Sequence, residues 1–179
     1  MPPNWLALRM FNHIYVVLTL NNHMPQIELE TIINSKIEIC FDLSRSIDLH
    51  KISTVATKEK AIDGKTSGLI NLNEFVTWQA TYFGISQKLT SKITQYNRPF
   101  YFRDEQLKGA FKYLIHDHHF QVIGDKVIMK DNFRFQSPFG YAGKLFDKLL
   151  LTNYLKKLLL KRNDTIKQYA ETQKCINFQ

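Results

Sequence analysis

Cysteine is scarce in this sequence of 179 residues. Cys40 and Cys175 are far apart, and neither belongs to a CxxC pair. Small secreted domains and zinc ribbons depend on closely spaced cysteines, so this usage excludes a disulfide framework and a zinc ribbon. It is typical of a protein from a reducing compartment. We therefore expect a cytoplasmic location, with a peripheral position at the membrane as the other option.

A long uninterrupted apolar run is also missing. The stretch from Trp5 to Leu20 is largely apolar, but Arg9 and His13 interrupt it, and a membrane-spanning helix needs about 20 apolar residues. A signal peptide would need basic residues before the apolar stretch and small residues at a cleavage site, and neither is present. We expect residues 1–23 to be a poorly packed leader, with Met24 as a candidate for the true start.

Sequence signatures of catalysis and cofactor binding are missing as well. The sequence has no nucleophile motif, Gly-rich phosphate loop, cofactor fingerprint, HExxH pair or RNA-binding signature. This favours a binding protein over an enzyme, and we expect no cofactor and no nucleic-acid partner. Internal repeats and low-complexity runs are absent too, so a chain of this length should form one domain with a substantial core.

Positive charge is plentiful and concentrated near the C-terminus. The formal net charge is +8, and residues 144–174 contain eight basic residues against three acidic ones. The basic residues Lys156, Lys157, Lys161 and Arg162 suggest a surface that rests on anionic lipid. The alternative is the solvated face of an ordinary amphipathic helix.

Hydrophobic periodicity predicts one strand followed by two short helices. Residues 27–32 alternate between apolar and polar as in a half-buried strand. Ser35 and Glu38 have the spacing of a capping box, which predicts a helix that continues to Leu43. A second short helix is expected around Ile47 to Ile52.

The middle of the chain predicts an antiparallel sheet, and its end predicts a long helix. Turn residues at 63–64, 84, 97–99, 108–109 and 124–125 separate runs rich in Thr, Val and aromatic residues. The predicted strands are Glu74 to Phe83, Ser86 to Tyr96, Phe100 to Leu107, Phe111 to Ile123 and Asp125 to Phe135. Short connections between them indicate an antiparallel meander. The helix is expected over Ala142 to Thr172, which gives a domain over residues 24–172 and a tail over 173–179.

The stretch from Asn97 to Phe120 carries an unusual set of polar residues for two strands. Its two extended runs meet at Lys108-Gly109 and include Asp104, Glu105, His116, Asp117, His118 and His119. Charged groups on strands that pack against a core are costly unless they are paired or used. This hairpin is therefore either a polar patch in a ligand cavity or a solvated face of the sheet.

These hairpin residues and the order of elements resemble a known superfamily. The matching residues are Phe102-Arg103-Asp104-Glu105-Gln106, Gly109-Ala110-Phe111, His116, His118, Phe120, Asp131, and Pro138-Phe139-Gly140-Tyr141-Ala142-Gly143. Together they resemble the START-like, SRPBCC superfamily, which includes polyketide cyclase/dehydrase-like and coenzyme-Q-binding proteins. The likeness is closer to its small bacterial ligand-binding SRPBCC branch, some members of which are labelled cell-division proteins. Ala110 and Leu114 depart from that branch, which usually has a proline and an aromatic residue at these positions.

The resemblance spans about residues 26–170 and implies an α+β helix-grip fold. In this fold a curved antiparallel sheet wraps a long C-terminal helix and leaves an apolar cavity between them. Such cavities hold lipids, quinones, polyketides or similar molecules. The superfamily contains both enzymes and carriers, so the fold alone does not give the function.

Strand parity predicts a polar site in this cavity. Leu114, His116, His118 and Phe120 share one face of their strand, because alternate side chains point the same way. Asp131 lies on the corresponding face of the next strand, so a His–Asp pair facing the cavity is expected. The pair could satisfy only itself and the backbone, orient a polar ligand group, or transfer protons. With a third ligand, His116 and His118 could also bind a metal ion.

We predict that the chain binds a hydrophobic or amphipathic small molecule without catalysis. The expected ligand-binding residues are Trp78, Tyr82, Leu89, Ile93, Leu114, His116, His118, Met129, Asp131, Phe133, Tyr154, Leu155 and Leu158. No catalytic or metal-binding residue is assigned. The alternatives are a cyclase- or dehydratase-type enzyme that uses the same His/Asp cluster, and an interaction module in cell-division or envelope processes.

Overall fold

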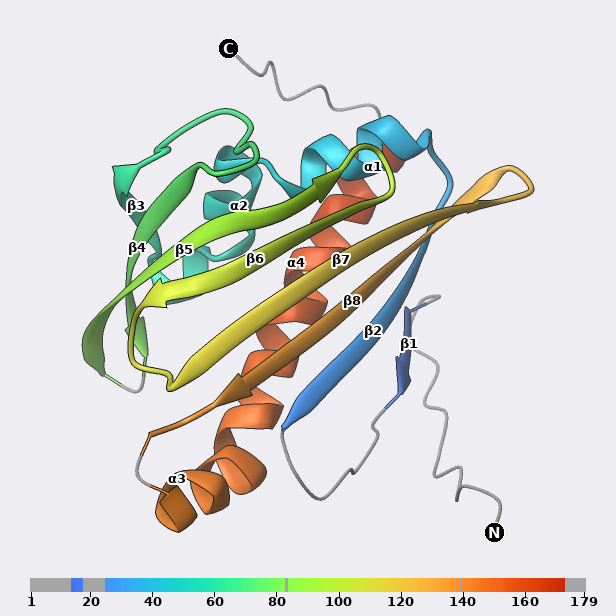
Figure 1. The fold of residues 1–179 in the computed structure, drawn as a ribbon. Helices are drawn as coiled ribbons and strands as arrows, with labels where there is room; N and C mark the ends of the chain where they lie inside the picture. Colours follow the sequence, from blue (N-terminus) through green and yellow to red (C-terminus); the bar gives the residue numbers. More distant parts are fainter. Residues whose placement is uncertain (1–13, 18–24, 83, 139, 173–179) are drawn as a thin grey trace, which may run out of the picture.

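A curved antiparallel sheet of eight strands wraps a long C-terminal helix in a computed structural model of the protein (Figure 1). The structure describes residues 14–17, 25–82, 84–138 and 140–172. The strand order is β1-β2-β8-β7-β6-β5-β4-β3, and every neighbouring pair is antiparallel. The α+β helix-grip architecture predicted from the sequence is confirmed.

The strands of the predicted meander lie within one or two residues of their expected bounds. The sheet as a whole comprises β1 (Ile14–Val17), β2 (Gln26–Ile33), β3 (Lys60–Gly64), β4 (Phe75–Tyr82), β5 (Ile85–Asn97), β6 (Tyr101–Lys108), β7 (Tyr113–Ile123) and β8 (Lys126–Gln136), of which β4 to β8 form the meander. β1 and β3 were not predicted. β1 lies inside the expected leader, where it pairs with β2, and the rest of residues 1–23 and the tail 173–179 lie outside the described residues.

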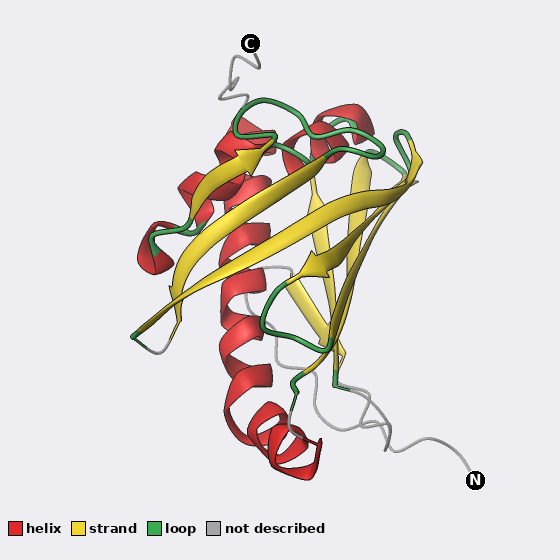
Figure 2. Ribbon diagram, turned by 60° about the vertical axis from the view of Figure 1, so that its left-hand side comes forward, coloured by secondary structure: helices red, strands yellow, loops and turns green. Residues whose placement is uncertain are grey.

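The helices cover the concave face of the sheet (Figure 2). They are α1 (Ile37–Ser44), α2 (Ile47–Ser53), α3 (Gly140–Phe146) and α4 (Thr152–Thr172), and a 3-10 turn follows α2 at Val55–Thr57. A π-helical turn at Asp147–Leu151 joins α3 to α4, so the predicted C-terminal helix contains an irregularity. None of the described helices is long and apolar enough to cross a lipid bilayer.

Alternation along β2 and β8 explains how the concave face is buried. Ile27, Leu29 and Ile33 of β2 are buried, and the residues between them are partly exposed. β8 repeats the pattern, since Val127 and Phe135 point inward. A strand with period-two alternation buries one face and leaves the other to solvent. This is the signal that made the sheet predictable.

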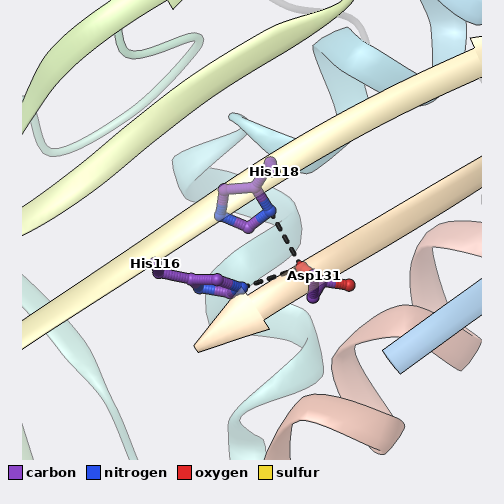
Figure 3. A group of neighbouring side chains, drawn as sticks. All are labelled: His116, His118 and Asp131. Atoms are coloured by element: carbon purple, nitrogen blue, oxygen red, sulfur yellow. Dashed lines mark hydrogen bonds and ion pairs between the residues drawn. The ribbon is translucent and has the colours of Figure 1, made fainter. Parts of the chain in front are cut away.

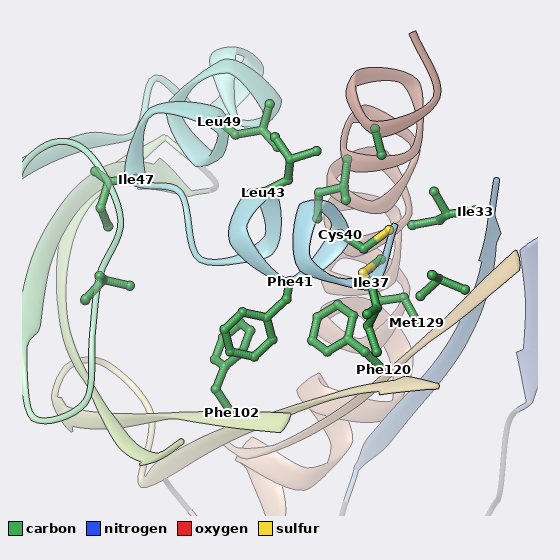
Figure 4. Close-up of a cluster of buried hydrophobic side chains, with 14 of the residues drawn as sticks. Ile33, Ile37, Cys40, Phe41, Leu43, Ile47, Leu49, Phe102, Phe120 and Met129 are labelled. Carbon is green, nitrogen blue, oxygen red and sulfur yellow. The ribbon is translucent and has the colours of Figure 1, made fainter. Parts of the chain in front are cut away.

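Phe41 of α1 anchors the larger of two apolar clusters (Figure 4). Its ring meets the rings of Tyr96, Phe102 and Phe120 edge-on, each at a centroid separation of 5.4 Å. Edge-on geometry is a favourable arrangement for aromatic pairs. The second cluster joins β2, β7 and β8 to α4 through residues such as Phe133 and Leu159. The two clusters hold α4 against the sheet.

Two local predictions were wrong because contacts with other parts of the fold decide the structure at these positions. Lys36, without a side-chain hydrogen bond, occupies the N-cap of α1, and the Ser35 hydroxyl donates instead to the Ala170 carbonyl of α4. The predicted capping box therefore does not form. Asp63-Gly64 is not a turn between strands but belongs to β3, because Gly64 lets the backbone approach Phe75. A Cβ at Gly64 would lie 2.2 Å from the Phe75 carbonyl oxygen.

Candidate functional site: a cavity with a buried polar cluster

A cavity of about 570 Å³ lies between the concave face of the sheet and α4. Strands β4 to β8 and helix α4 supply most of its wall, and α3 contributes to it near Pro138. Gly143 of α3 is needed there, because a Cβ at this position would lie 2.0 Å from the Pro138 carbonyl oxygen. Most of the lining side chains are apolar, as in typical sites for small organic molecules.

Most of the residues that the sequence assigned to a ligand lie together in this wall. The lining includes Trp78, Leu89, Ile93, Leu114, His116, His118, Phe133, Tyr154, Leu155 and Leu158. Met129 is not part of the lining, because it is fully buried in the larger apolar cluster. Asp131 is also fully enclosed and lies behind the two histidines. The side chain of Tyr82 lies outside the described residues.

His116, His118 and Asp131 meet at one side of the cavity (Figure 3). The register pairs His118 of β7 directly with Asp131 of β8, as expected for neighbouring strands. Nε2 of His116 is 2.8 Å and Nδ1 of His118 is 2.9 Å from the same Oδ1 of Asp131. The second carboxylate oxygen accepts a hydrogen bond of 2.6 Å from the Asn163 amide of α4. Asp131 thus links two strands to the helix.

Burial and hydrogen bonding shift the pKa of Asp131 in opposite directions, and together they determine which groups of this cluster are charged. Burial alone would raise the pKa of Asp131, but hydrogen bonds from His116 and His118 hold that pKa well below its usual range. Burial lowers the pKa of His118 well below 6.5, and the neighbouring His116 acts in the same direction. Asp131 is therefore an ionised hydrogen-bond acceptor, and His118 is neutral at neutral pH.

Arg162 of α4 also belongs to the cavity wall, although the sequence analysis placed it on a lipid-facing surface. Its side chain is 11% exposed, one guanidinium nitrogen donates to the Ser44 carbonyl, and Nη1 lies 3.8 Å from Oδ1 of Asp131. Helical spacing carried the missed signal. Arg162 lies four residues after Leu158 and four before Ile166, so it shares their inward face.

Asp104 and Glu105, the two adjacent acids of the hairpin, lie on opposite faces of β6. Asp104 lines the cavity, whereas Glu105 points outward and pairs with Arg103 at 3.5 Å. That partner lies on the same strand, two residues before Glu105. Burial raises the pKa of Asp104 above 3.8, despite a hydrogen bond from Ser91.

Apart from Nδ1 of His118, which faces Oδ1 of Asp131 at 2.9 Å, two lining side chains have a buried polar atom that forms no hydrogen bond with the described residues. These atoms are Oδ1 of Asp104 and Nη1 of Arg162. Each such atom costs about 1–3 kcal/mol when it is buried without a partner. The cavity wall therefore contains a donor, on Arg162, and an acceptor, on Asp104, without partners. The free-energy cost of burying them would fall if a bound molecule or water formed hydrogen bonds with them.

The cluster also has the residue types of a metal site. Ligand atoms of His116, His118 and Asp131 lie within 4.8 Å of one another. The guanidinium of Arg162 lies beside the same carboxylate oxygen and opposes the binding of a cation there. The residues could ligate zinc by type, but the local charge favours the hydrogen-bonded arrangement.

The opposite face of the hairpin holds a separate polar group. Asp117 accepts hydrogen bonds from Arg103, Arg134 and Tyr101. Burial alone would raise the pKa of Asp117, but these partners lower it to about 2. His119 is exposed on the same face. The structure thus separates Asp117 and His119 from the cavity, as strand parity predicted.

Known structures with the same fold cover most of this chain. A START superfamily protein from Mycobacterium smegmatis has a TM-score of 0.61 and 7% identity, and the match covers 83% of this chain and 98% of that one. The major latex-like protein 151 from Panax ginseng has a TM-score of 0.60 and 15% identity, with 82% and 97% covered. Ara h 8.0201 has a TM-score of 0.61 and 11% identity, with the same coverage.

Sequence comparisons add no relative to these structures. No protein-family model matches the chain, and no curated protein is similar to it. At 7–15% identity, the structural matches establish the START-like helix-grip fold and nothing about ligands.

Proposed function

We propose that this protein binds a hydrophobic or amphipathic small molecule in the cavity between the sheet and α4. The proposal depends chiefly on one observation, a cavity of about 570 Å³ with a mostly apolar wall and one polar side. This volume is within the range of roughly 300–1,000 Å³ that is usual for small-molecule sites. The START-like fold of the chain supports the proposal as an analogy of architecture.

The apolar part of the ligand would contact Trp78, Leu155 and Leu158, which lie on opposite walls of the cavity. Its polar end would lie near Asp104 and Arg162. An oxygen atom there could accept from Nη1 of Arg162, and a hydroxyl could also donate to Oδ1 of Asp104. Lipids, quinones and polyketide-like molecules combine an apolar body with such oxygens.

Asp131 supports a positioning role for the polar cluster. Because its pKa is held low and both of its oxygens have partners, it is a weak proton acceptor. His118 is 2% exposed and its low pKa keeps it neutral. These groups fix the geometry of the wall rather than take part in proton transfer.

One observation favours catalysis as a second candidate. His116 lines the cavity, and its Nε2 is held by Asp131, an arrangement that could orient an acid or base. A cyclase- or dehydratase-type reaction would use it. Under that hypothesis His116→Asn would abolish turnover and leave ligand affinity nearly intact.

Titration with N-phenyl-1-naphthylamine, a neutral apolar fluorescent probe, tests ligand binding. Leu158 lines the cavity, so Leu158→Trp should reduce the space in it and weaken probe binding by about tenfold or more. Lys157→Trp is the matched control, because Lys157 is the adjacent exposed residue of α4 and is not part of the lining. Equal probe affinity in wild type and Leu158→Trp, with both proteins folded, would exclude the cavity as the binding site.

A further inference from the structure

An apolar stripe on α3 and the π-helical turn is exposed to solvent. Tyr141, Leu145 and Leu149 are spaced four residues apart, and both leucines are 59% exposed. Leu150 follows them at 57%. Apolar residues at this spacing normally pack one face of a helix against a core. A contiguous exposed apolar patch instead indicates a surface that meets another apolar partner.

The same segment forms part of the cavity wall. Ala142, Phe146 and Leu151 line the cavity, while Leu145 and Leu149 point outward. The turns β4–β5 and β6–β7 lie at this end of the molecule as well (Figures 1 and 2). Phe111, in the β6–β7 turn, also lines the cavity, and Ile85, directly after the β4–β5 turn, is exposed. We call the outer surface of residues 84–89, 107–112 and 140–151 the mouth surface.

Charge on the mouth surface has one sign. The side chains that the structure describes in its three segments include three lysines and one acid, Asp147. Lys88, Lys108 and Lys112 are exposed. Asp147 is fully buried, and it accepts hydrogen bonds from the backbone N–H and the hydroxyl of Ser137. The acid is thus withdrawn from the surface, and the exposed leucines lie at the same end of the molecule as the strand ends that carry the exposed lysines (Figure 1).

We propose that the mouth surface docks on an anionic lipid bilayer. Exposed aliphatic side chains among lysines are the combination that binds the interface of such bilayers, since the apolar groups enter it and the cations face its phosphates. Docking would bring the cavity wall against the acyl region, so that an apolar ligand could pass without crossing water. The passage of a ligand between bilayer and cavity, unlike docking itself, rests on the proposed function of ligand binding in the cavity.

This surface differs from the lipid-facing surface expected from the sequence. That surface was to comprise Lys156, Lys157, Lys161 and Arg162, but Arg162 points into the cavity wall. Lys156 is partly buried, and burial lowers its pKa. The mouth surface combines exposed cations with exposed leucines, and only such a combination supplies both attraction and insertion.

Vesicle co-sedimentation tests the proposal. Wild-type protein should sediment with phosphatidylcholine vesicles that contain phosphatidylglycerol, more weakly with pure phosphatidylcholine, and less as salt is added. The pair Leu145→Ser/Leu149→Ser should weaken binding by at least about tenfold, because two exposed leucines no longer enter the bilayer. The pair Lys108→Glu/Lys112→Glu should weaken it only on anionic vesicles.

Val122→Ser/Ile123→Ser is the matched control, because both residues are exposed on the β7–β8 hairpin at the other end of the molecule (Figure 1). N-phenyl-1-naphthylamine binding by every variant shows that the cavity is intact. Lost probe binding in the wild type with retained sedimentation would contradict the proposed function alone.

Three results would overturn docking. One is wild-type protein that stays in the supernatant with both vesicle types, and another is an equal loss of binding in the control pair. The third is a wild-type dimer in light scattering that the leucine substitutions convert to a monomer, which would assign the mouth surface to a second copy of the chain.

Discussion

At the residue scale, Asp104 and Asp131 show how position sets the role of a buried carboxylate. Asp131 has two histidines, an amide and a nearby guanidinium as neighbours, and its pKa is low. Asp104 keeps one oxygen without a hydrogen bond to the described residues, and its pKa is raised. The first arrangement stabilises structure, whereas the second leaves an acceptor at a cavity wall at a cost in stability.

Asp104→Asn should stabilise the protein at neutral pH. Burial raises the folded-state pKa of Asp104 above its unfolded value, so the folded protein loses stability as pH rises through that interval and keeps the penalty above it. Asparagine does not ionise and can still bond to Ser91. The free energy of unfolding, measured in urea, should therefore exceed that of wild type at pH 7 and match it below pH 3.8.

Asp104→Asn should also weaken binding of a ligand that donates a hydrogen bond to Asp104.

An Asp104→Asn variant that is less stable than wild type at pH 7 would contradict the stability prediction. It would show that groups other than those described above compensate the charge of the ionised carboxylate.

At the scale of single elements, the sequence predicts best what is local. β2 and β8 could be predicted because alternation follows from burial of one face. β3 was missed because its sequence is polar and it depends on Gly64 to approach Phe75. The capping box at Ser35 failed because the hydroxyl has a partner in α4, which is 135 residues away.

The real side-chain cap belongs to α2. Ser46 accepts a hydrogen bond of 3.1 Å from the backbone N–H of Leu49, and no comparable side-chain bond caps α1. Ser46→Ala should therefore cost about 1 kcal/mol in the free energy of unfolding. Ser67→Ala, at an exposed loop position, should change it by less than about 0.5 kcal/mol. Equal effects in chemical denaturation would show that Ser46 does not stabilise α2.

At the scale of the whole molecule, the order of elements together with the resemblance to the START-like superfamily predicted the architecture, and strand parity predicted one side of the site. Parity placed His116, His118 and Asp131 together because a two-residue repeat has a definite inner face. Strand parity could not reveal Arg162, which lies on a helix, and only the four-residue spacing from Leu158 indicated its inward face. Its nearness to Asp131 of β8 depends on how α4 packs on the sheet. The volume of the cavity depends on sheet curvature, which no local pattern encodes.

The central claim is that the cavity between sheet and helix holds an apolar molecule. Native mass spectrometry of protein purified from cells tests it most directly. Wild type should retain an added mass that disappears after denaturation, and Leu158→Trp should retain less of it, because the larger side chain takes up part of the cavity. Wild-type protein that carries no added mass, even after incubation with N-phenyl-1-naphthylamine, would contradict the account.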